Sequence, residues 1–197
     1  MRTSPRVRLS LAVFTVALAA ASAGCRHKAK TPADGYKRLV AAVTAGDGGA
    51  LFDALDQETR WNWMSIQKFH REAYDIVLSN YPEGEIRERE TRRFEHAATA
   101  PSARDLFIVD AAPTVLPSLR PLMVQGAPIE AGTTEDTAAA VTPAGARVEL
   151  KRSKDGDWGY GGLAKRAEED KNRAYQDLEL VRASAADFER AAARAGK

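Results

Sequence analysis

The stretch Ala146–Tyr160, "ARVELKRSKDGDWGY", decides the fold class, because it carries the clearest β signal in a chain whose other periodic segments are mostly helical. Val148 and Leu150 alternate with charged residues, which is typical of a strand that buries one face and leaves the other in water. Asp155-Gly156 is a favoured hairpin turn. Trp158 follows on the returning strand. The stretch therefore predicts an antiparallel β-hairpin.

A strand and a long helix are predicted on either side of this hairpin. Thr137–Val141 is interpreted as a short strand. After Gly161-Gly162 a last helix is predicted to run toward Ala193, with apolar residues in a 4-3-4-3-4 spacing that forms one amphipathic seam. We expect this seam to cover either the domain's own sheet or another helix of the same chain. Its members are Ala174, Leu178, Val181, Ala185, Phe188 and Ala192.

The first half of the chain predicts helices separated by short breaks. A helical pattern begins at Asp34, with apolar residues at three- and four-residue spacing, and it stops at the glycines of Ala45–Gly49. A short helix is predicted through Leu51–Leu55, and the polar residues of Asp56–Trp61 are interpreted as a turn. A third helix is predicted over about Asn62–Asn80, where a broad apolar face recurs.

The middle of the chain gives weaker signals. The charged segment Glu85–Ala98 is interpreted as a helix with a thin apolar stripe. Leu106–Val109 is apolar but so short that periodicity leaves strand and helix both open. Prolines between residues 113 and 128 predict short helical turns and loop, which would form a lid or a partner surface. The fold class is therefore α+β, with N-terminal helices, a small antiparallel sheet in the second half and a long C-terminal amphipathic helix.

The N-terminus has the three parts of a secretory signal. Basic residues open the chain, and an apolar run of 15 residues, Leu9–Ala23, ends in small side chains. As a helix this run is roughly 22 Å long, which is short of the roughly 30 Å hydrocarbon core of a bilayer. We therefore expect a segment that is removed, not a membrane span.

The sole cysteine of the chain follows directly. The order Ser22-Ala23-Gly24-Cys25 resembles a bacterial lipoprotein box, with Ser22 where leucine is usual. The resemblance implies cleavage after Gly24 and acylation of Cys25. Two or three acyl chains would anchor the protein durably, because each buried methylene adds about 0.8 kcal/mol.

Three other roles for Cys25 are weaker. It is not predicted to be one half of a disulfide within the chain, since no second cysteine exists. A nucleophilic thiol so close to a terminus would lack a fixed base to lower its pKa. An ordinary buried cysteine would not explain the signal that precedes it.

These features divide the chain into residues 1–24 as the signal peptide, 25–33 as the lipidated cysteine and tether, and 34–197 as one α+β domain. The signal holds three arginines and no acid, so the 26 basic residues after it face 27 acidic ones. A mature chain of nearly balanced charge predicts no nucleic-acid partner. Arg26 after the anchor favours the outer membrane, by analogy with well-studied bacteria.

Two stretches resemble the NTF2-like superfamily, which includes small bacterial lipoproteins. Tyr36–Arg60, "YKRLVAAVTAGDGGALFDALDQETR", has the form of its opening helix pair, and Val141–Tyr160 has the form of its closing antiparallel strands. The resemblance implies a curved sheet around the helices, often with a pocket inside. It transfers no functional residue, because the family has no invariant catalytic motif to match.

The three histidines of the sequence are the first candidates for a catalytic residue. His27 falls in the tether and His96 in the charged segment, where both are expected to be solvated. His70 falls on the apolar face of the third helix with Tyr74 one turn on, so the pair is a candidate proton shuttle. The simpler alternative is a half-buried histidine bonded to a backbone carbonyl or to water. No metal-ligand spacing, phosphate loop or nucleophile elbow accompanies it, so we expect no cofactor and no metal.

Three functions remain, in order of preference. The first is a lipid-anchored, non-enzymatic scaffold or binding module of the cell envelope, held to the membrane by its anchor and facing an envelope protein partner. The charged block Glu83–Glu95 is a candidate docking surface for such a partner. The second is a small-ligand pocket of NTF2-like type, and the third is an enzyme using His70. The candidate pocket residues are Trp61, Trp63, His70, Tyr74 and Trp158.

Overall fold

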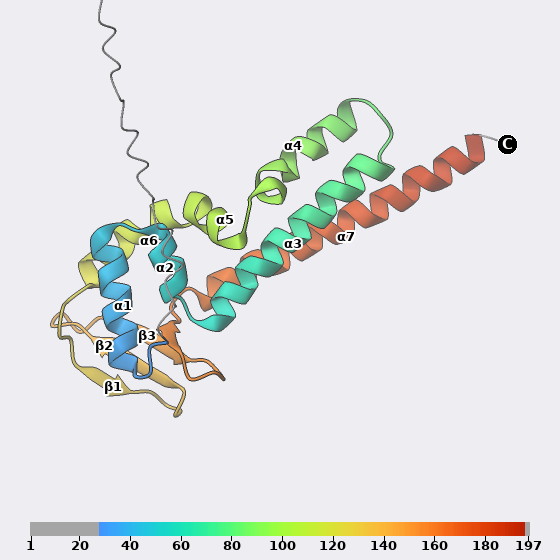
Figure 1. The fold of residues 1–197 in the computed structure, drawn as a ribbon. Helices are drawn as coiled ribbons and strands as arrows, with labels where there is room; N and C mark the ends of the chain where they lie inside the picture. Colours follow the sequence, from blue (N-terminus) through green and yellow to red (C-terminus); the bar gives the residue numbers. More distant parts are fainter. Residues whose placement is uncertain (1–27, 196–197) are drawn as a thin grey trace, which may run out of the picture.

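The computed structural model describes residues 28–195, which form a body and a long arm that extends from it (Figure 1). We call α1, α2, α5, α6 and the sheet the body, and α3, α4 and α7 the arm. The α+β class is confirmed. The signal peptide, Cys25 and His27 lie outside the described residues. In chain order the elements are α1 Pro32–Ala45, α2 Gly48–Ala54, α3 Gln57–Asn80, α4 Glu85–Thr99, α5 Ala103–Asp110, α6 Ala112–Leu119, the short 3₁₀ turn Arg120–Leu122, β1 Ile129–Ala131, β2 Thr137–Val141, β3 Arg147–Arg152, β4 Trp158–Tyr160 and α7 Ala164–Ala195.

The sheet is an antiparallel meander in the order β1-β2-β3-β4. Its second, third and fourth strands are the ones that the sequence predicts, and β1 is an addition. The turn between β3 and β4 places Gly156 at φ 80°, a backbone region that favours glycine. Helix α1 lies directly against β4, because a Cβ on Gly35 would stand only 2.9 Å from the carbonyl oxygen of Trp158. One face of the sheet is therefore closed by α1.

The fold begins earlier than the sequence predicts. The Ala29 N–H donates to Asp157 Oδ1 at 2.8 Å, and the Trp158 N–H donates to the Ala29 carbonyl at 3.0 Å. Thr31 then caps α1, its side chain accepting from the Asp34 N–H at 3.1 Å. Residues 29–33, assigned above to the tether, are thus part of the body.

The predicted turn between Asp56 and Trp61 is wrong. These residues form the first turn of α3, because the Asp56 side chain caps the helix. Its Oδ1 accepts from the Thr59 N–H at 3.1 Å, and its Oδ2 accepts from the Thr59 hydroxyl at 2.5 Å. Polar residues that satisfy the free N–H groups of a helix start resemble a turn in sequence.

The middle of the chain is mostly helical up to Leu122, and a loop over residues 123–128 leads to β1. Leu106–Val109, left open above, belongs to α5. The proline-containing segment forms short helices and a loop, as predicted: Pro113 occupies the first turn of α6, where a missing N–H costs nothing, and Pro117 lies inside that helix. Phe107 and Val115 are buried in the core of the body. The segment therefore closes the core and is not a lid.

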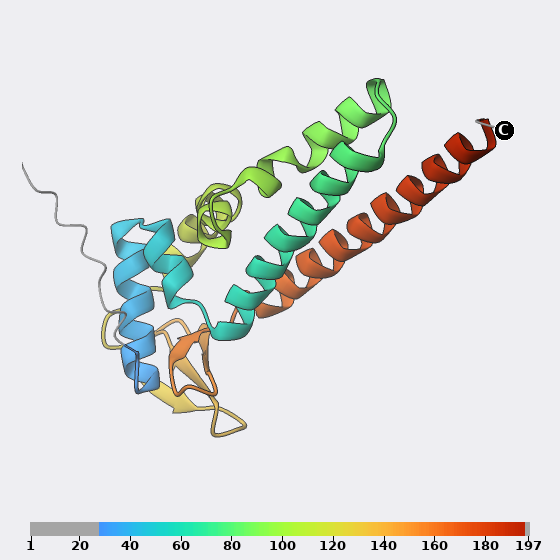
Figure 2. The same cartoon turned by 45° about the vertical axis from the view of Figure 1, so that its right-hand side comes forward.

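The interior consists of two apolar clusters. The body cluster centres on Phe107, whose ring lies 5.5 Å from Phe52 and 5.3 Å from Trp63 between centroids. In the arm, α7 and α3 run side by side in the same direction, and α4 returns toward the body along α3 (Figure 2). The predicted seam of α7 packs on α3 as far as Phe188, so its partner is a helix and not the sheet, but its last member, Ala192, is exposed. The arm cluster consists of Ala73, Val77, Tyr81, Phe94, Leu178, Val181 and Ala185.

None of the helices described between residues 28 and 195 is long and apolar enough to cross a membrane.

Candidate functional site

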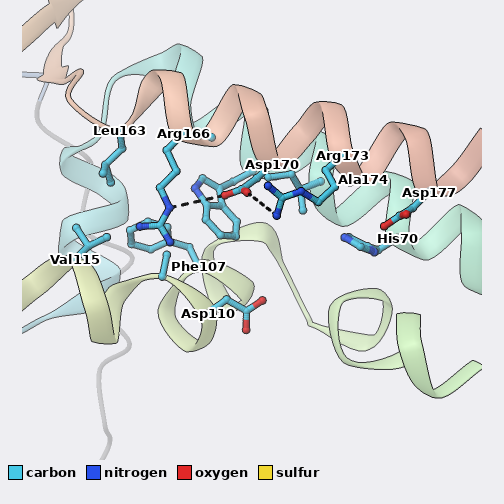
Figure 3. A pocket seen from close by; sticks show the side chains of 14 residues that line it. His70, Phe107, Asp110, Val115, Leu163, Arg166, Asp170, Arg173, Ala174 and Asp177 are labelled. Carbon is cyan, nitrogen blue, oxygen red and sulfur yellow. Dashed lines mark ion pairs between the residues drawn. The ribbon is translucent and has the colours of Figure 1, made fainter.

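A cavity of about 240 Å³ lies at the root of the arm, where α3 and α7 leave the body and pass α5 and α6 (Figure 3). We call it the root cavity. One side is apolar, and its base is formed by Trp63 and Phe107, whose rings meet edge to face at 87°. Ile66 from α3 and Val115 from α6 extend this apolar side. Both aromatic rings belong to the body cluster, so the base is held rigidly.

The other side of the root cavity is charged, and most of that charge comes from one face of α7. Arg166, Asp170, Arg173 and Asp177 follow one another at four- and three-residue steps, which places them in line along the helix. Asp170 pairs with Arg166 at 4.0 Å and with Arg173 at 3.7 Å, as the dashed lines of Figure 3 mark.

These two pairs are loose. The arginine side chains are 64% and 74% exposed, and exposed pairs of this kind contribute roughly 0–1 kcal/mol each. The guanidinium groups of Arg166 and Arg173 can therefore leave Asp170 for a ligand at little cost.

His70 reaches the root cavity from α3. Burial lowers its pKa below the ordinary value of 6.5, while the Asp177 carboxylate raises it, Arg93 lowers it and Asp110 raises it. The Nδ1 atom is buried and has no hydrogen-bond partner. At neutral pH the imidazole is therefore uncharged, with one ring nitrogen unsatisfied.

The carboxylates nearest His70 are engaged elsewhere. Asp177 Oδ1 lies 2.6 Å from a guanidinium nitrogen of Arg93, and Asp110 Oδ1 lies 2.7 Å from Nε2 of His96. Each carboxylate thus has another partner through Oδ1, and the buried Nδ1 of His70 bonds to neither, whereas a general base is usually oriented by such a bond.

The chemistry available in the root cavity suits binding. Among the described residues that line it, none carries a hydroxyl, a thiol or an amine, and its ionisable groups are three carboxylates, two guanidinium groups and the His70 imidazole. The chain between residues 28 and 195 also contains no group of three or more His, Cys, Asp or Glu side chains that could hold a metal ion. An apolar base under mobile charges accommodates a small ligand with both an apolar and a charged part.

The residues predicted to form one pocket are divided among four places. Trp63 and His70 line the root cavity. Trp61 is 55% exposed, because a step of two residues along the helix places it on nearly the opposite face from Trp63. Tyr74 packs against the arm cluster. Trp158 is buried in the body, between β4 and α1.

Comparison with protein-family models, with curated protein sequences and with solved structures gave no match. The lipoprotein and NTF2-like resemblances therefore stay predictions from the sequence.

Proposed function

We propose that this protein is a lipid-anchored, non-enzymatic binding module of the bacterial cell envelope, and that its arm contacts a protein partner. The observation that carries the proposal is the exposure of α4. Of its 15 residues only Phe94 and Ala98 are buried. The other side chains of α4 are not buried by contacts within the arm and remain accessible to a partner.

The outer part of α4 has the composition of an interface that selects its partner. The segment Glu85–Arg93 mixes both signs of charge, and its pair of Arg92 with Glu88 at 3.8 Å is exposed on both sides. Ile86 of α4 is 45% exposed, and Leu78 of α3, which is 36% exposed, lies in a shallow hollow with Arg87 and Glu88 of α4. Charges around an apolar spot direct encounter and orientation, while the apolar spot supplies the buried contact.

The position of the proposed anchor agrees with this role. Ala29 is fixed to the body, and four Cα steps back to Cys25 span at most about 14 Å. An acylated Cys25 would thus keep the body beside the lipid surface. The 32 residues of α7 make a helix of about 48 Å, which carries the end of the arm away from the body (Figure 1).

Photo-crosslinking in the native envelope tests this proposal. A photoreactive amino acid at Arg92 in α4 is expected to give one discrete protein adduct, and the same residue at exposed Lys154 in the β3–β4 turn is expected to give none. Equal adducts from both positions, or none from α4, would contradict the assignment of the arm. In parallel, Cys25→Ser is expected to lose incorporation of a labelled fatty acid.

A second candidate function is the binding of a small ligand in the root cavity, favoured by the meeting of Trp63 and His70 there. Its volume suits a molecule smaller than the usual drug-sized ligand. A zwitterionic ligand that binds the native state is expected to raise the thermal midpoint by mass action. Asp110→Asn should reduce that shift, and a saturable activity lost in His70→Ala would favour an enzyme instead.

A further inference from the structure

A second hollow, of about 620 Å³, runs along the outer side of α1. We call it the α1 groove. Its walls are Tyr36, Val40 and Ala41 of α1 on one side, and Ala127 and Ile129 of the segment that leads into β1 on the other. It lies in the body and shares no lining residue with the root cavity.

The two hollows differ sharply in chemistry. Six titratable or charged side chains line the root cavity, whereas Lys37 is the only charged one among the described residues of the α1 groove. The other polar groups of the groove are those of Thr44 and Gln125, beside the Tyr36 hydroxyl, which has partners of its own. A ligand without polar groups along its length fits such a lining, because it leaves few protein groups without hydrogen-bond partners.

The far wall of the α1 groove is fixed by hydrogen bonds. The Val124 N–H donates to the Tyr36 hydroxyl at 3.1 Å, and that hydroxyl faces the carbonyl oxygens of Leu122 at 3.2 Å and of Val124 at 3.1 Å. Gly126 then turns the chain at φ 72°, and the Ala127 N–H donates to the Val124 carbonyl at 3.3 Å. The groove is thus built into the fold and does not depend on a loosely held loop.

The groove begins next to the start of the described chain. Ala33, in the first turn of α1, is part of its lining, and Ala29 lies only four residues before it. Cys25 lies four residues before Ala29, so the Cα atoms of the two residues are at most about 14 Å apart. From Ala33 to Ala45 the groove follows α1 for about 18 Å. A long, straight apolar chain fixed to Cys25 matches both the starting point and the length.

We propose that the α1 groove receives one of the acyl chains carried by Cys25, so that the body is clamped to its own lipid. This inference rests on the proposed lipidation of Cys25. Lys37 beside the groove then faces the lipid surface, where its ammonium group can meet anionic head groups. The remaining chain or chains stay in the leaflet, and the body is held at a fixed orientation to the lipid surface.

Metabolic labelling with a photoreactive fatty acid tests the inference on the full-length protein in its own membrane. After irradiation and digestion, the expected product links the N-terminal Cys25 peptide to the peptide that contains α1. A phospholipid joined to the α1 peptide would show that the groove takes a membrane lipid, and would overturn the assignment to Cys25. Label confined to the Cys25 peptide, with no link to α1, would overturn the groove as an acyl site.

Two tryptophan variants provide the control. Ala41→Trp fills the groove and is expected to reduce the Cys25–α1 link at least tenfold, with incorporation of the fatty acid unchanged. Ala183→Trp, at an exposed alanine on α7, is expected to leave the link intact. Circular dichroism confirms that both variants fold. If the wild-type protein takes up no fatty acid at all, the proposed anchor itself fails and the groove assignment fails with it, an outcome distinct from uptake without the link.

Discussion

The body and the arm each bury one phenylalanine completely, and the two residues have different surroundings. Phe107 of the body lies among other rings, 5.5 Å from Phe52 and 5.3 Å from Trp63. In the arm, the ring centroids of Phe94 and His70 are 5.7 Å apart. The guanidinium carbon of Arg93 lies 5.0 Å from the centroid of the Phe94 ring. Both phenylalanines are 0% exposed. Equal burial thus coexists with a large apolar cluster in one region and a narrow one in the other.

The exposed fraction of a side chain alone does not describe how well its region is stabilised by packing. In the body, helices cover one face of a sheet and one another, so a core residue has partners on several elements. In the arm, α4 contributes only Phe94 and Ala98 to the interior. Segments with few buried apolar contacts open locally at a lower free energy than the whole protein unfolds. We therefore expect the arm, and α4 above all, to open before the body.

The largest effect is expected from Phe107→Ala. Removing a ring at the centre of the body cluster should lower the free energy of unfolding by about 3–5 kcal/mol, because the lost apolar contact is joined by the cost of a cavity. Chemical denaturation followed by circular dichroism measures it. A loss below about 1 kcal/mol would mean that the body cluster is not the main source of stability.

Phe94→Ala is the matched change in the arm. We expect a smaller loss of about 2–3 kcal/mol, because water can reach the narrow cluster and the helix can move. Hydrogen exchange should show faster exchange over Glu85–Thr99, while the amides of β2 and β3 keep their protection. Uniformly faster exchange in both regions would remove the distinction between body and arm.

The charged centre of the body provides a third test. Asp157 is 9% exposed and accepts from the Ala29 N–H, and it pairs with Arg38 at 3.2 Å and with Arg60 at 3.8 Å. Asp157→Asn keeps the shape and removes the charge, and we expect a loss of about 2 kcal/mol, because two partly buried guanidinium groups lose their counter-ion. Asp155→Asn, in the exposed turn beside it, is the control and should leave the free energy of unfolding unchanged.

The smallest effect is expected from His70 and depends on pH. Because its pKa is lowered in the folded protein, the unfolded chain binds the proton more readily. The free energy of unfolding should therefore fall as the pH drops below 6.5, and the loss should be complete below the pKa of the folded state. His70→Gln should reduce the difference between free energies measured at pH 7.5 and 5.5. An unchanged difference would show that burial of His70 carries no such penalty.

Much of the fold could be predicted because local signals and tertiary structure agree. The Asp155-Gly156 turn and the alternation before it specify β3 and β4 without help from the rest of the chain. β1 has no such signal, since Ile129–Ala131 is too short to alternate and is defined by its pairing with β2. The start of α3 was missed because the capping role of Asp56 becomes clear only once the helix is known.

The candidate site was predictable only in part. His70 could be singled out because it interrupts an apolar face, and Trp63 lies on that same face. The line of Arg166, Asp170 and Arg173 was overlooked, because charged residues beside a seam resemble an ordinary solvated surface. Only the placement of α5 and α6 opposite that line encloses it, and no local pattern specifies that placement. The seam spacing of α7 is the one signal that could have located its charged flank.

The shared direction of α3 and α7 constrains the order in which the molecule can be assembled. Two neighbouring helices that point the same way cannot be joined by a short loop, and here Tyr81 and Val181 meet across 100 positions of sequence. A ribosome or an export channel releases α3 long before α7, so Val77 and Tyr81 lack their α7 partners until that helix has been made. A chain that stops before Ala164 would leave these apolar side chains without their α7 contacts, so completion of the arm cluster depends on α7.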